Sequence, residues 1–209
     1  MRRIFQTLFV ALSLLLFSLT RLHATQVLPV NMSDILSRAD VAFIGTCVGV
    51  EVGEVSSSPG SGKLPVTTYV FSVAKDGVIK GNIPEKFRLT QFGISKSESL
   101  KRMLPYTIGM PSYEIGKEYT LFLTPESSLG LRSTIGLGQG KFNIFTGKDG
   151  KKQVINDHGN KGLFNNMPQT KGVTKAMGAA KLSVMAPPPE GALELNSFVN
   201  LLQELKKGE

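Results

Sequence analysis

Histidine, cysteine and tryptophan, three residue types that often stabilise or functionalise a small domain, are scarce in this sequence. It contains two histidines, one cysteine and no tryptophan among 209 residues. A single cysteine excludes an intramolecular disulfide, and the chain has no His-x-x-x-His or Cys-x-x-Cys spacing for a metal or redox centre. We therefore predict no metal ligands, no cofactor-binding residues and no catalytic residues, and a fold that depends on its hydrophobic core.

The single cysteine, Cys47, lies in an apolar segment with a strand-like pattern, so we expect it to be a buried small hydrophobic residue. An intermolecular disulfide and a nucleophile are the alternatives. A nucleophilic cysteine needs a base, and the one histidine outside the N-terminal segment is His158, in a loop rich in glycine and asparagine. Because no Ser-centred elbow is present either, we predict that the protein is not an enzyme, with an enzyme of unknown class as the alternative.

Long apolar runs are also scarce, and the one that exists lies at the N-terminus. A basic start precedes a mostly apolar stretch at residues 4–19, and Ala24 offers a small residue for cleavage before Thr25. This arrangement predicts a secretory signal peptide over residues 1–24, with an uncleaved anchor as the alternative. The run is shorter than the roughly 20 residues of a transmembrane helix. We expect an exported chain, periplasmic or extracellular, with no stable membrane insertion after cleavage.

Acidic residues are few, and the basic excess is concentrated in one stretch. Cleavage would remove three of the 24 basic residues and no acidic one, which leaves 21 against 16. Residues 148–181 hold seven lysines and two aspartates, so they account for the whole remaining excess. We expect a solvated, flexible tail, with weak attraction to anionic surfaces as the alternative. Nucleic acid is not expected as a partner, because the stretch lacks interleaved aromatic residues that could stack on bases.

Alternating apolar and polar residues predict a mainly β domain over residues 25–156. Strands are expected at residues 41–52, 66–74, 86–92 and 118–124, then from residue 142, with a short return at 153–155. The first of these strands is long, apolar on both faces and contains glycine, as the bent strands of small barrels require. A short helix is expected at residues 31–40, with Ser33 as its cap and Ile35 and Leu36 facing the domain.

Two loops and one glycine-rich turn interrupt the strands. Residues 56–65 form a Ser/Gly/Pro loop, and residues 93–116 mix prolines with aromatics around a helical turn at 95–103. We call residues 93–116 the excursion, and we expect it to pack on the domain, as long functional loops often do. The glycines at 136, 138 and 140 precede an extended run, so they indicate a β-turn or bulge and not a phosphate loop.

The C-terminal quarter divides into a predicted arm and a predicted helix. Residues 157–192 are rich in glycine, lysine and proline, so we expect a linker or loosely packed arm in which residues 163–164 dock on the domain. Residues 193–207 form an amphipathic helix with Asn196 as its cap and an apolar stripe of Leu195, Phe198, Leu201, Leu202 and Leu205. This helix either covers an opening of the barrel or binds a partner.

The order of these elements resembles a known fold. The segments that carry the resemblance are Ala39-Asp40 with the VAFIGTCV run that follows, Tyr69-Val-Phe-Ser-Val-Ala, Val78-Ile-Lys-Gly81 and Gly116-Lys-Glu-Tyr-Thr-Leu-Phe-Leu123. They resemble the OB-fold barrel of netrin-like modules and tissue inhibitors of metalloproteases, and most of all bacterial exported proteins of that layout, over about residues 33–125. The resemblance implies a small five-stranded, OB-like Greek-key barrel with a short N-terminal helix and a C-terminal amphipathic helix.

The resemblance does not extend to the inhibitory mechanism of that family. Its inhibitors grip a zinc ion through an N-terminal cysteine, whereas Thr25 begins the expected mature chain and the family's disulfides are missing here. We therefore expect an exported, non-enzymatic binding protein with a protein or glycan partner in the cell envelope. The candidate binding-face residues are Arg88, Thr90, Tyr106 and Tyr113, beside the loops that OB barrels use for ligands. An inhibitor or accessory protein of an exported peptidase is the alternative.

Overall fold

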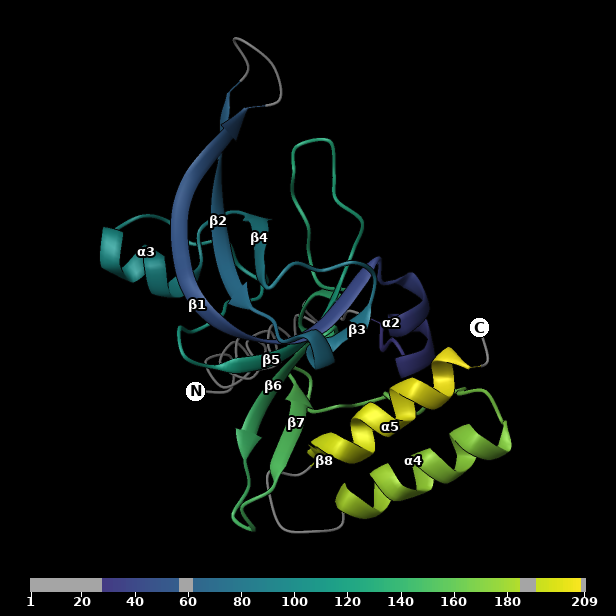
Figure 1. The fold of residues 1–209 in the computed structure, drawn as a ribbon. Coiled ribbons are helices and arrows are strands. Elements are labelled where there is room, and N and C mark those ends of the chain that lie inside the picture. The colour runs from purple at the N-terminus through teal and green to yellow at the C-terminus, as the bar shows by residue number, and fades with distance from the viewer. Residues whose placement is uncertain (1–27, 57–61, 185–190, 208–209) are drawn as a thin grey trace, which may run out of the picture.

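The computed structural model describes residues 28–56, 62–184 and 191–207 (Figure 1). The predicted signal peptide at 1–24, its cleavage point between Ala24 and Thr25, and the tip of the first loop at 57–61 lie outside these residues. The described elements are α2 (Met32–Arg38), β1 (Val41–Ser56), β2 (Lys63–Ser72), η1 (Lys75–Gly77), β3 (Val78–Lys80), β4 (Lys86–Phe92), α3 (Lys96–Arg102), β5 (Glu118–Leu123), η2 (Leu137–Gln139), β6 (Lys141–Thr146), β7 (Lys152–Asn156), α4 (Lys171–Val184), β8 (Leu193–Glu194) and α5 (Leu195–Lys206).

The strands confirm a mainly β fold, but their arrangement corrects the prediction of a closed five-stranded barrel. In the described chain, eight strands form one antiparallel sheet in the order β4-β2-β1-β5-β6-β7-β8, with β3 paired to β1. A barrel would require β6 to pair with β4. Instead β6 pairs with β5 on one edge and with β7 on the other, so the edge needed for closure is already occupied. The sheet therefore stays open.

The sheet carries hydrophobic residues on both faces, as the pattern of β1 predicts. On one face, Ala42 and Phe122 belong to a core cluster that includes residues of α2, α4 and α5. On the other face, Phe43 and Leu121 belong to a second cluster with the aromatic residues of β2 and β4. Figure 1 shows α4 and α5 side by side below the sheet, with α2 close to the end of α5. The bent β1 thus lies between two cores.

The C-terminal helix α5 packs on its own domain. Four of the five residues of its predicted stripe are buried, and Leu195 is partly buried. The Phe198 ring lies 4.8 Å from that of Phe142 and 6.5 Å from that of Phe122, between centroids. The cap position is Glu194, two residues before the predicted Asn196, and residues 193–194 of the predicted range form the short strand β8. Self-docking is therefore what the structure shows, in place of a helix held out for a partner.

The predicted linker at residues 157–192 is largely ordered, which corrects its description as a loose arm. It contains α4, whose Val173 and Met177 are buried in the first core cluster together with Leu163 and Met167. The docking of residue 163 is confirmed. Alanine, lysine and methionine favour a helix here, whereas the glycines interrupt the apolar pattern that would have indicated one. Residues 185–190, with the prolines, lie outside the described chain.

Two local predictions need smaller corrections, and a third agrees with the structure. The cap of α2 is Asn31 and not Ser33, because the Asn31 side chain accepts a hydrogen bond from the Asp34 amide at 2.8 Å. The expected loop at 56–65 is strand at both of its ends, since β1 extends to Ser56 and β2 begins at Lys63. The glycine-rich segment forms the short 3-10 turn η2 before the extended β6, as a turn and not a phosphate loop.

Candidate functional site

The predicted binding-face residues Arg88 and Thr90 lie on one face of β4 and are already engaged by neighbouring strands. The Arg88 guanidinium donates to both carboxylate oxygens of Glu51, at 2.7 and 3.2 Å. This hydrogen bond, and the positive charge behind it, lowers the pKa of Glu51. Thr90 shares a hydrogen bond of 3.0 Å with the hydroxyl of Thr68 on β2. Exposed pairs of this kind contribute little to stability. Arg88 and Thr90 therefore present a polar surface whose hydrogen bonds are already made within the sheet.

Tyr113 was expected on the binding face, and its burial corrects that prediction. The side chain is 1% exposed, and its ring centroid lies 4.6 Å from that of Tyr69 and 5.3 Å from those of Phe71 and Tyr119. Burial raises the pKa of its hydroxyl well above the ordinary value. Because Tyr113 points into the second core, it anchors the excursion to the sheet. Arg88 and Tyr113 therefore do not share a surface.

Tyr106, by contrast, is exposed, and it belongs to a larger group that the sequence analysis did not identify. The excursion presents six large apolar side chains to solvent, which we call the apolar patch: Leu100, Met103, Leu104, Tyr106, Ile108 and Ile115. Met103 is 94% and Ile108 83% exposed. Isolated exposed apolar residues are ordinary, whereas contiguous groups of them mark interaction sites, which makes this segment the candidate docking surface.

Hydrogen bonds hold the excursion in place despite its irregular backbone. The Gly93 amide donates to the Pro65 carbonyl at 2.7 Å, and the Thr107 amide donates to the Ile94 carbonyl at 3.0 Å. At the far end, the Tyr119 hydroxyl accepts from the Glu114 amide at 2.9 Å. The segment is thus tied to β2 at its start and to β5 at its end, and its apolar residues are presented from a fixed base.

Helix α3 adds a charged cluster to the start of the apolar patch. The helix lies within the predicted turn at 95–103, and Ser95 caps it by accepting a hydrogen bond from the Glu98 amide. Glu98 is buried, and its carboxylate accepts from Lys101 at 2.8 Å and from Arg102 at 3.4 Å. The hydrogen bond from Lys101, followed by that from Arg102, lowers the pKa of Glu98. The two cations next to Leu100 therefore share one buried counter-charge.

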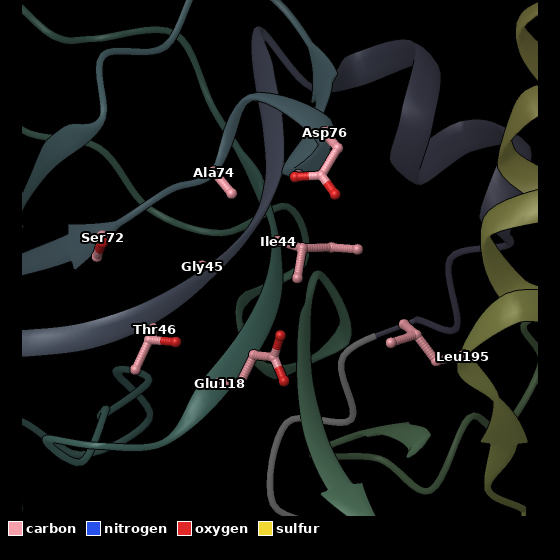
Figure 2. Close-up of a pocket in the computed structure, with 9 residues that line it drawn as sticks. Ile44, Gly45, Thr46, Ser72, Ala74, Asp76, Glu118 and Leu195 are labelled. Carbon is pink, nitrogen blue, oxygen red and sulfur yellow. The ribbon is translucent and has the colours of Figure 1, made fainter. Parts of the chain in front are cut away.

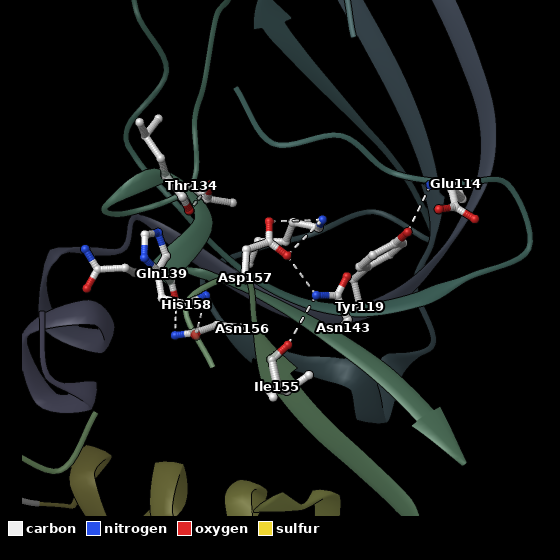
Figure 3. A network of polar contacts seen from close by, with 11 residues as sticks. Glu114, Tyr119, Thr134, Gln139, Asn143, Ile155, Asn156, Asp157 and His158 are labelled. Carbon is white, nitrogen blue, oxygen red and sulfur yellow. Dashed lines mark hydrogen bonds and ion pairs between the residues drawn. The ribbon is translucent and has the colours of Figure 1, made fainter. Parts of the chain in front are cut away.

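A polar network lies between the excursion and the β6–β7 hairpin (Figure 3). The Lys141 ammonium donates to Asp157 at 3.2 and 3.3 Å, although the Lys141 side chain is only 8% exposed. The same nitrogen lies 5.5 Å from the ring centroids of Tyr113 and Tyr119, a distance at which the aromatic faces stabilise a cation. Asn143 donates to the Asp157 carboxylate at 2.9 Å. Burial raises the pKa of Tyr119 to about 12, so its hydroxyl stays neutral.

A cavity of about 340 Å³ adjoins this network. Met110 and Pro111 of the excursion line one side of the cavity, and Leu137, Asp157 and His158 line another. The sequence analysis missed Lys141 and Asp157. The sequence did contain one indication of the pair. The alternation in KFNI places Lys141 and Asn143 on the face of β6 opposite to Phe142 and Ile144. If that face is also covered, the Lys141 cation is buried and needs an acidic partner.

Cys47 and His158 do not form a nucleophilic pair in the described chain. Cys47 is fully buried, and burial raises the pKa of its thiol, which disfavours the thiolate that a nucleophile needs. Its sulfur donates weakly to the Gly49 carbonyl at 3.7 Å, whereas His158 lines the cavity beside the excursion. Within the described residues, no group of three His, Cys, Asp or Glu side chains could hold a metal ion.

Comparisons with known proteins add no relative. Protein-family models, curated proteins and solved structures were all searched, and none matches the chain. Among the described helices, none has both the length and the apolar character required to cross a membrane. The likeness to netrin-like modules therefore stays a prediction, and function has to be argued from the apolar patch, the network and the cavities.

Proposed function

We propose that the protein is an exported, non-enzymatic binding protein that docks a partner protein on the apolar patch. One observation carries this proposal: an ordered segment exposes Leu100, Met103 and Ile108 at 74, 94 and 83%. The centres of protein interfaces are enriched in methionine and aromatic residues and depleted of charge, which fits the patch and its Tyr106. A glycan partner would favour a polar surface, so a protein is the better match.

The anchoring of the excursion supports binding. Tyr113 is packed among aromatic rings, and the Glu114 amide is bonded to Tyr119, so the exposed residues between α3 and β5 start from a fixed base. A segment that is already ordered loses less conformational entropy when it binds. The cations of α3 at the edge of the patch, Lys101 and Arg102, would favour a partner with an acidic rim.

We further propose that β1, β2, β4, β5 and β6 form an OB-like unit that β7 keeps open. The order β4-β2-β1-β5-β6 supports this assignment, because a five-stranded Greek-key barrel has the same neighbours before closure. The excursion would then connect the third and fourth strands of that unit. OB-like domains commonly bind ligands through loops next to the barrel, which agrees with a docking role for the excursion.

A capture experiment tests the docking surface. The purified chain from Thr25 would be added to native envelope and secreted fractions and crosslinked gently. It would be compared with a Met103→Ser/Ile108→Ser variant and with Phe92→Ser, which alters an exposed apolar residue outside the patch. We expect one stoichiometric protein with the wild type and with Phe92→Ser, and its loss with the patch variant. Retention of that protein by the patch variant would contradict the proposal, as would binding to anionic vesicles alone. A peptidase as the captured protein would favour the inhibitor alternative.

A further inference from the structure

Strand β1 loses one of its two neighbours partway along its length. At Thr46 it still has a partner on each side, Ser72 of β2 and Glu118 of β5, next to a cavity of about 380 Å³ (Figure 2). The register with β5 ends at this residue. From residue 48 onward, β1 pairs with β2 alone within the described chain. We call the unpaired side of residues 48–55 the free edge.

The alternation of hydrogen bonds shows which residues offer backbone groups at the free edge. In an antiparallel ladder, the N–H and C=O of one residue point to the same side, and successive residues alternate. On β2, the Val73 amide and the Pro65 carbonyl both bond to the chain that flanks β4, so the even-numbered residues of β2 face β1. Their partners on β1 are the odd-numbered residues from 49 to 55. The residues that turn their N–H and C=O groups toward the free edge are therefore Val50, Val52 and Glu54. Within the described residues, these groups have no hydrogen-bond partner.

The free edge has little of the protection that edge strands usually carry. Natural edges are commonly protected by lysine or other unpaired charges, by proline or by bulges. Residues 48–55 read VGVEVGEV, with neither proline nor lysine, and the bulge of β1 lies only at their beginning. The two charges are already paired with cations of the sheet, Glu51 with Arg88 of β4 at 2.7 Å and Glu54 with Lys63 of β2 at 3.0 Å. The free edge is therefore open to another strand.

The free edge begins where the apolar patch ends. The carbonyl of Cys47 accepts from the Gly116 amide at 2.8 Å, and its amide donates to the Lys117 carbonyl at 2.9 Å. Ile115, the last residue of the patch, directly precedes Gly116 and is 62% exposed. Val48, the first residue of the free edge, directly follows Cys47 and is 47% exposed. The two surfaces are therefore continuous at this point.

We propose that the partner docked on the apolar patch adds an extended segment to the free edge, as a further strand of the sheet. The unpaired N–H and C=O groups of a strand edge are matched by another backbone in the extended conformation, so the chemistry of the edge itself selects a strand as its occupant. Eight residues of β1 extend about 27 Å, which suits a partner segment of similar length. This inference rests on the proposed docking function, because it states how the same partner binds.

A second copy of this chain fits the free edge less well. Specific interfaces bury roughly 1,200–2,000 Å² of surface in total. Two free edges side by side would meet along a ladder about 27 Å long and about 5 Å wide. An antiparallel pair would also place the start of one edge beside the end of the other, so the two apolar patches would not meet. A different protein covers the edge and the patch together, and thereby reaches the area that a stable complex needs.

The probe is a random library of peptides displayed on phage, depleted on a Val52→Pro variant and then selected on the purified wild-type protein. Amide hydrogen exchange of the wild type, with and without a selected peptide, then locates the bound strand. We expect the amides of Val50, Val52 and Glu54 to exchange rapidly in the free protein and to become protected when the peptide binds. The amides of Glu51 and Gly53 should be protected in both states, since they face β2.

Val52→Pro removes one N–H of the free edge and leaves the β1–β2 ladder in place, because the backbone groups of Val52 point away from β2. It should weaken peptide binding and partner capture about tenfold or more, since one hydrogen bond is lost and a carbonyl of the added strand is left unsatisfied. The matched control Val52→Thr keeps the N–H and the β-branched shape and should bind like the wild type. Peptides N-methylated at successive positions repeat the test without altering the protein, and binding should be lost at alternate positions only.

The patch variant Met103→Ser/Ile108→Ser separates this inference from the proposed function. Loss of partner capture in the patch variant but not in Val52→Pro would support docking on the patch and refute the added strand. Loss in Val52→Pro but not in the patch variant would refute docking on the patch and retain the added strand. Failure to select any peptide, protection confined to other residues, or a dimer of the wild type that Val52→Pro abolishes in sedimentation would overturn the proposal.

Discussion

Truncation of Phe198 tests whether α5 is part of the folding core or a helix available to partners. The side chain is fully buried, and its ring contacts those of Phe122 and Phe142, which come from β5 and β6. Replacing a buried phenylalanine by alanine costs about 3–5 kcal/mol, since the transfer free energy is lost and a cavity remains. Typical domains unfold with only about 5–15 kcal/mol. Phe198→Ala should therefore remove a large share of the stability.

The assay is thermal and urea unfolding followed by circular dichroism. For a domain of this size, each kcal/mol shifts Tm by about 2–4 °C, so Phe198→Ala should lower Tm by about 6–20 °C. The matched control is Phe92→Ala, the same substitution at a ring that is 43% exposed, with an expected cost below about 1 kcal/mol. If the free energy of unfolding of Phe198→Ala lies within about 1 kcal/mol of the wild-type value, α5 contributes little to the core. That result would favour the alternative in which this helix binds a partner.

Three further predictions follow from the buried polar groups. Asp157→Asn should destabilise the protein by about 1–3 kcal/mol, because it leaves the buried Lys141 cation without its counter-charge. The cost is moderate since the Asp157 side chain is itself 36% exposed. Urea denaturation should show that Lys141→Met/Asp157→Asn recovers part of the stability lost in the single variant. The free energy of unfolding should decline as pH rises above about 10, since a tyrosine ionises there in the unfolded chain whereas burial raises the pKa of Tyr119 to about 12 in the folded protein. The urea midpoint of Tyr119→Phe should therefore fall less over this pH range than that of the wild type. An equal fall in the two proteins would contradict the assignment to Tyr119. Cys47 should react with a thiol reagent in urea but hardly at all in the native protein, and rapid native labelling would show that it is accessible.

Much of the sheet can be predicted from the sequence, because its strands alternate strongly. The bounds of β4 agree with the prediction at residues 86–92, and β5 differs by one residue at its end. The two-sided apolar pattern of β1 correctly indicates a strand buried on both faces in its first half. Such patterns indicate where a strand lies and which of its faces is buried. They do not indicate which strands pair along their edges.

Closure of the sheet and the helix α4 could not be derived in the same way. Whether β6 pairs with β4 or with β7 depends on competition between edges, and a hairpin turn at residues 146–152 brings β7 to β6 locally. In α4, Gly172 and Gly178 interrupt the helical pattern, and the helix is held by tertiary contacts of Val173 and Met177. Contacts of this kind join residues that are distant in the sequence, so the local pattern of residues does not predict them.

The candidate site was predicted only in outline. The sequence correctly drew attention to the excursion, but it could not distinguish Tyr106, which is exposed, from Tyr113, which is buried. Both are tyrosines within two residues of a proline. What separates them is the ring cluster that Tyr113 forms with Tyr69 of β2 and Tyr119 of β5. Lys141 escaped notice for the same reason, since its partner Asp157 lies directly after the next strand, β7.

The proposed docking site lies where regular pairing of the sheet is interrupted. The apolar patch belongs to the segment that connects β4 to β5. Connecting segments of this kind can carry binding residues while a rigid scaffold positions them. Because Met103 and Ile108 are 94 and 83% exposed, the Met103→Ser/Ile108→Ser variant should lose partner capture while its urea midpoint stays close to that of the wild type.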